Sequence, residues 1–112
     1  MPQGVGNIDE VCEFAITFLL TGQGDARRLA VALAERGPQR PPLDIAFVLS
    51  LAAASIEEVL TSPQLALAAA DAWRTAALVG VDLHMMQQQG LPHADCADLL
   101  RYWRTVDGYF LT

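Results

Sequence analysis

The chain contains no lysine, and its seven basic residues, all arginines, face thirteen carboxylates for a formal charge of −6. A nucleic-acid-binding protein gains much of its affinity from basic side chains that neutralise phosphates. The net field of this acidic chain repels a polyanion. We therefore predict that it has no nucleic-acid partner.

Cysteine is scarce, and the common motifs of cofactor-binding enzymes are missing. Only Cys12 and Cys96 occur, without a CxxC pair, which argues against a disulfide framework and favours a reducing compartment. The sequence contains no P-loop, no GxGxxG and no Gly-x-Ser-x-Gly. We predict no cofactor and, more generally, a non-catalytic protein.

Signals for export and membrane insertion are absent as well. No basic residue precedes Arg27, and Asp9 and Glu10 stand where a secretory signal would be apolar. The longest uncharged helical stretch, residues 45–56, is shorter than the roughly 20 residues that cross a bilayer. These features predict a soluble cytoplasmic protein without membrane contact.

Apolar residues, in contrast, are abundant, at 53% of the 112 residues. An ordinary soluble domain contains about 45 to 50%. A small domain has much surface for its volume, so surplus apolar side chains must face water or be covered by another molecule. The composition favours a homo-oligomer, with a dimer as the simplest form, or a protein partner.

The spacing of the apolar residues predicts an all-α bundle of about five helices in a single domain, residues 1–112, because no stretch alternates with period two. Asn7, Asp25 and Ser62–Pro63 are suited to begin helices. Residues 1–6 should form a flexible N-terminal tail. The predicted helices cover residues 8–21, 25–36, 43–60, 63–89 and 94–106.

Two helices have unusual patterns. The first turns of helix 43–60 are apolar all round, which predicts a central position in the core. Helix 63–89 contains Gly80, a predicted weak point or break because glycine costs about 1 kcal/mol in a helix interior. Its residues Gln64, Asp71, Thr75 and Asp82 make one polar line opposite many alanines, which permit close helix pairing.

His84, His93 and Cys96 are candidate metal ligands, since imidazole and thiolate bind zinc or copper. The alternative is that Cys96 is a small core residue on the apolar stripe of the last helix. No glutamate precedes either histidine by three positions, so the Glu-x-x-His pair of di-iron bundles is absent. We accordingly predict no metal site.

Glu57 and Glu58 lie in the last turn of a predicted helix, where carboxylates oppose the helix dipole. We hypothesise that this pair meets an arginine of the same or a second subunit. The candidate partners are Arg40, Arg101 and Arg104.

The function that these observations favour is a helical interaction or regulatory module that acts through homo-oligomerisation or partner binding. An alternative is a small apolar-ligand binding domain with a pocket near Phe47, Trp73 and Met86. A third is an enzyme that uses His84 or His93 as acid or base.

Large aromatics dominate interface energetics, although the two tryptophans suit a core equally well. With Glu57 and Glu58, the predicted contact residues are Trp73, Tyr102, Trp103, Tyr109 and Phe110.

Overall fold

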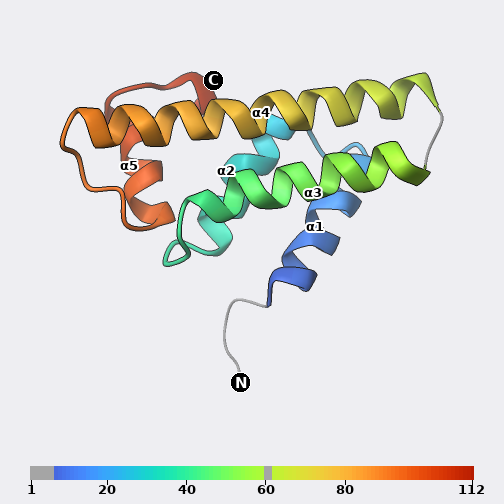
Figure 1. Cartoon of the computed structure of the whole chain (residues 1–112), viewed down its shortest axis with the longest axis horizontal. Helices are drawn as coiled ribbons and strands as arrows, with labels where there is room; N and C mark the ends of the chain where they lie inside the picture. Colours follow the sequence, from blue (N-terminus) through green and yellow to red (C-terminus); the bar gives the residue numbers. More distant parts are fainter. Residues whose placement is uncertain (1–6, 60–61) are drawn as a thin grey trace.

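A computed structural model describes residues 7–59 and 62–112, and all regular structure in them is helical, as predicted (Figure 1). The predicted tail, residues 1–6, and residue 60 at the predicted end of the third helix lie outside the described residues. The helices are α1 (Ile8–Leu20), α2 (Ala26–Arg36), α3 (Leu43–Val59), α4 (Pro63–Gln88), α5 (Cys96–Thr105) and the short 3-10 helix η1 (Tyr109–Leu111).

Three helices begin at the residues that the sequence indicates. The side chain of Asn7 accepts a hydrogen bond of 3.0 Å from the third residue of α1 and completes a capping box. Asp25 accepts one of 2.9 Å in α2, and Ser62 accepts one of 3.4 Å in α4, with Pro63 at the first position. Each such bond satisfies a free N–H group and contributes about 1 kcal/mol.

The molecule is two helix layers thick. Helix α4 runs across most of the view, α3 runs beside it in the opposite direction over the right-hand part, and α2 passes behind them (Figure 1). The shortest dimension of the molecule is 19 Å, about twice the 10 Å diameter of a helix. The outer side of the α3/α4 pair is therefore left without a covering helix among the described residues.

The inner sides of the helices meet in one continuous hydrophobic core. Leu29 of α2, Leu49 of α3 and Trp103 of α5 are completely buried there. The apolar end of the chain docks on this core, because the ring of Phe110 stacks on Trp103 at 4.3 Å between centroids. This contact ties η1 to α5.

The predicted break at Gly80 is wrong, because α4 is continuous from Pro63 to Gln88. A single glycine costs about 1 kcal/mol, which the long contact between α4 and α3 outweighs. The helix ends at Gln88, close to the predicted residue 89, and Gly90 beyond its cap has a φ of +68°, the left-handed conformation that glycine adopts without strain.

Candidate interaction surface

Helix α3 carries a stripe of exposed apolar side chains. Leu43, Phe47 and Leu51 follow one another at four-residue spacing and are 63%, 49% and 40% exposed. The opposite side of α3, with Ile45, is buried. The predicted central position of this helix is thus wrong: α3 is covered on its inner side, while its outer side faces solvent.

Helix α4 carries a second such stripe. Leu67, Trp73 and Val81 are 73%, 41% and 54% exposed, and exposed alanines lie between them. In sequence this is the alanine-rich side that was expected to pair closely with another helix. Among the described residues no helix covers it.

Three of the four residues of the polar line of α4 point into the molecule, and the fourth, Gln64, is exposed. The Oδ2 atom of Asp71 accepts a hydrogen bond of 3.0 Å from the backbone N–H of Ala26, at the start of α2. The Oδ2 atom of Asp82 accepts one of 2.9 Å from the indole N–H of Trp103. Thr75, between these two aspartates, is buried. Helix α4 therefore has apolar side chains on both sides: Val79 and Met86 are buried together with Asp82, while the exposed stripe faces outward.

Burial has a clear electrostatic effect on Asp82. Desolvation raises the pKa of this carboxyl above its ordinary value of 3.8, and the charge of Asp107 raises it further. The hydrogen bond from Trp103 acts in the opposite direction, because it stabilises the carboxylate. Asp82 has a structural role as the hydrogen-bond acceptor of the buried Trp103 indole. It lines neither the groove nor the cleft described below.

The two exposed stripes form one surface. Leu43 borders a shallow groove together with Gly80 and His84, so α3 and α4 meet there side by side. Near the other end, the indole N–H of Trp73 donates a hydrogen bond of 3.1 Å to Oε1 of Glu57. We call this surface the α3/α4 face. Its apolar residues are Leu43, Phe47, Leu51, Leu67, Trp73, Ala77, Val81 and Met85.

Charge on the α3/α4 face is confined to one end. Glu57 and Glu58 are exposed where α3 ends, and Arg74 beside them pairs with Asp71 of its own helix at 3.0 Å. From Phe47 to the end of the face with Leu43 and His84, none of the exposed side chains is a carboxylate. The middle of the face is apolar and uncharged.

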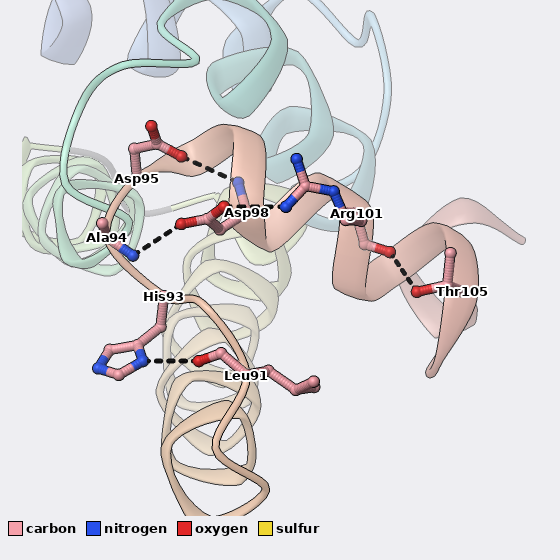
Figure 2. A network of polar contacts seen from close by, with 7 residues as sticks. All are labelled: Leu91, His93, Ala94, Asp95, Asp98, Arg101 and Thr105. Carbon is pink, nitrogen blue, oxygen red and sulfur yellow. Dashed lines mark hydrogen bonds and ion pairs between the residues drawn. The ribbon is translucent and has the colours of Figure 1, made fainter.

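The hypothesised pairing of Glu57 and Glu58 with an arginine stays a prediction. Within the described residues of one chain, neither forms an ion pair. Arg40 pairs with Asp44 at 3.4 Å. An ion pair of 3.0 Å joins Arg101 to Asp98 (Figure 2). The Asp98 carboxylate also accepts the backbone N–H of Ala94, while the backbone N–H of Asp98 donates to Oδ1 of Asp95.

The predicted aromatic contact residues separate into two groups. Tyr102, Trp103 and Phe110 are 5%, 0% and 4% exposed, so they belong to the core of one chain. Trp73 and Tyr109 lie at the surface. The ring of Tyr109 holds the guanidinium of Arg27 at 4.8 Å, away from α3. Trp73 is thus the predicted aromatic that the α3/α4 face presents.

The structure does not gather His84, His93 and Cys96 at one point. The two histidines border the groove beside Leu43, and Nδ1 of His93 lies 2.9 Å from the backbone oxygen of Leu91 (Figure 2). Cys96 is buried at a different hollow, where its pKa is raised to about 12 by burial and by two nearby aspartates. Among residues 7–59 and 62–112, no three His, Cys, Asp or Glu side chains are placed to hold a metal ion.

Comparison with known proteins adds no family to this description. No protein-family model, no curated protein and no solved structure matches the chain. In the part of the chain that the structure describes, no helix has the length and apolar character to cross a membrane. The α3/α4 face is therefore the feature from which a function can be inferred.

Proposed function

We propose that the protein is a homodimeric interaction module whose two copies associate through their α3/α4 faces. The observation that supports this proposal is the set of exposed apolar side chains on the outer side of both α3 and α4. Phe47 and Trp73 lie outside, while Asp71 and Asp82 lie inside. Exposed apolar side chains concentrated on one surface are typical of a binding site rather than of a free surface.

The size of the face suits a dimer. With a rise of 1.5 Å per residue, the 17 residues of α3 and the 26 residues of α4 are about 25 and 39 Å long. Each helix presents a strip about 10 Å wide, which gives on the order of 650 Å² per copy. Two copies then bury about 1,300 Å², within the roughly 1,200 to 2,000 Å² of a specific interface.

The charges on the face select one orientation. In a symmetric dimer the same surface is used by both copies. If the α3/α4 pairs of the two copies ran in the same direction, Glu57 and Glu58 would meet their own counterparts in the other copy, and like charges would repel. The opposite direction places these carboxylates near the Leu43 and His84 end of the other copy. We therefore propose that the α3/α4 pair of one copy lies antiparallel to the α3/α4 pair of the other.

The test is to place a charge at the centre of the face. Phe47→Glu removes an exposed aromatic, so the single chain should keep its helical content. In the dimer the substitution buries two unpaired carboxylates, which should weaken association at least about 100-fold. Sedimentation velocity between 1 and 100 µM measures this change, and circular dichroism measures folding.

Leu20→Glu is the matched control. Leu20 is 44% exposed, similar to Phe47, but it lies on the outer side of α1. This variant should dimerise as the unmodified chain does. If Leu20→Glu and Phe47→Glu weaken association equally, the interface lies elsewhere. If neither weakens it, the α3/α4 face plays no part in association.

A further inference from the structure

A second hollow lies away from the α3/α4 face, between α1, α2, α3 and the start of α5. Its volume is about 420 Å³, within the roughly 300 to 1,000 Å³ of small-molecule sites. The pocket expected near Phe47, Trp73 and Met86 is not what the structure shows, since the first two are exposed and Met86 is completely buried. This cleft is lined by Glu10, Val11, Leu33, Arg36, Gly37, Arg40, Asp44, Ile45, Val48 and Cys96.

The floor of the cleft is apolar and chemically inert. Leu33, Ile45 and Val48 are 6%, 2% and 1% exposed, so they present fixed aliphatic surface from α2 and α3. The thiol of Cys96 completes the floor and points to the backbone oxygen of Pro41 at 3.9 Å. Because burial raises its pKa to about 12, this thiol is neutral and is not a nucleophile near pH 7.

The carboxylates at the rim are engaged within the chain. Glu10 accepts the backbone N–H of Asn7 at 3.0 Å as part of the capping box. Asp44 pairs with Arg40 at 3.4 Å. Both groups belong to the ends of helices and have a structural role there. Their charges are therefore partly compensated before any ligand arrives.

The rim has two arginines and two carboxylates and so carries no net charge, and Arg36 is the cation with donors available to a ligand. The guanidinium of Arg36 lies 4.1 Å from the ring centroid of Phe14, and its N–H groups donate no hydrogen bond among the described residues. A contact with a ring face leaves the edge donors of a guanidinium available to an anion. The side chain of Arg40 packs so closely on Gly37 that an added Cβ there would lie 2.9 Å from its Cδ.

From this arrangement we propose that the cleft binds a small aliphatic carboxylate. The hydrocarbon chain lies on Leu33, Ile45 and Val48, and the carboxylate lies at the rim beside Arg36. Arginine is the preferred partner of carboxylates because its planar fork can donate two parallel hydrogen bonds. The proposal is independent of dimerisation, since no residue of the cleft belongs to the α3/α4 face.

Octanoate is a suitable probe, with octylamine as the control of opposite charge and octanol as the uncharged control. Isothermal titration calorimetry on the full chain measures affinity, and amide NMR shifts show where the probe lies. We expect octanoate to bind most tightly and to shift Leu33, Ile45 and Val48. Equal binding of octanoate and octylamine, or no binding of octanoate, would overturn the proposal.

Two substitutions test the role of the arginines. Arg36→Gln should weaken octanoate binding about tenfold or more, because a hydrogen bond to a charged group is lost. Gly37→Ala should displace the side chain of Arg40 and also weaken binding. Arg104→Gln, at an exposed site on α5 outside the cleft, is the matched control and should leave binding unchanged. An equal loss in Arg104→Gln would show that only net charge matters and would reject the site.

Phe47→Glu separates this proposal from the dimer. The variant should bind octanoate with unchanged affinity even where it no longer associates. Loss of octanoate binding in Phe47→Glu with folding intact would contradict a ligand site confined to one chain.

Discussion

Gly80 provides a sharp test of how α4 is stabilised. It lies in the interior of a 26-residue helix, and a Cβ built on it meets no atom within 4 Å. Alanine therefore fits without strain. The substitution Gly80→Ala should raise the free energy of unfolding by about 0.5 to 1 kcal/mol, because alanine favours the helix and restricts the unfolded chain. For a chain of this size the gain raises Tm by about 4 °C.

The measurement is best made in the Phe47→Glu background, because association adds a concentration-dependent contribution to stability. Urea unfolding followed by circular dichroism gives the free energy, with an unchanged slope showing that the exposed area is the same. Ala77→Gly, one turn earlier at an exposed position of the same helix, is the mirror control and should lose about 1 kcal/mol. A Gly80→Ala variant that is no more stable, or less stable, would refute a continuous, unstrained α4.

The remaining predictions concern charged groups. Asp82→Ala should cost about 1 to 3 kcal/mol by leaving the Trp103 indole without an acceptor, whereas Asp82→Asn keeps an acceptor. The raised pKa of Asp82 means that its stabilising contribution is present below the unfolded value and is lost as pH rises through the folded pKa. The stability of Asp82→Asn relative to the unmodified chain should therefore increase as pH rises above about 4, and urea titrations with no such trend would contradict this. Asp98 has the opposite sign: the N–H of Ala94 lowers its pKa, so its contribution is present above the unfolded value and is lost as pH falls through the folded pKa. Asp98→Asn should thus be destabilising at pH 7 and nearly neutral in stronger acid, and a pH-independent loss would point to packing instead. Finally, the double variant Glu57→Gln, Glu58→Gln should weaken dimerisation at low salt, where ion pairs are least screened, and unchanged sedimentation there would reject the pairing of these carboxylates across subunits.

The helix boundaries follow closely from local chemistry. Asn7, Asp25 and Ser62 are short polar residues ahead of apolar runs, and each accepts the hydrogen bond that begins a helix. Such caps depend on neighbouring residues alone, so the sequence contains what is needed to predict them. The ends of α1 and α4 are likewise marked by Gly22 and Gly90, both with positive φ.

The orientation of the helices is less accessible from sequence. In the first turns of α3 the positions from Ile45 to Leu49 are all apolar, so periodicity does not distinguish the side with Ile45 from the side with Phe47. On α4 periodicity misleads, because Asp71 and Asp82 are expected outside and lie inside. Their partners are the N–H of Ala26 and the indole of Trp103, which are distant in sequence. Only the folded structure brings them together.

The candidate residues show the same limit. Trp103 and Phe110 stack in the core, while Trp73 reaches the surface, although all three are large aromatics on apolar segments. Val106 continues the apolar stripe of the last helix yet is 51% exposed, because it stands at the C-terminal cap of α5. The cleft beside Arg36 is lined by residues of four helices, so no local sequence motif predicts it.

The most direct test is the mass of the unmodified chain in solution. Sedimentation equilibrium between 1 and 100 µM should give twice the chain mass of 12.1 kDa, and the fluorescence of Trp73 should shift to shorter wavelength as the dimer forms. The two tryptophans are separated by Trp73→Phe, which should remove that shift because Trp103 is buried in either state. A mass of 12.1 kDa at every concentration, with Trp73 in water throughout, would contradict the dimer that the α3/α4 face predicts.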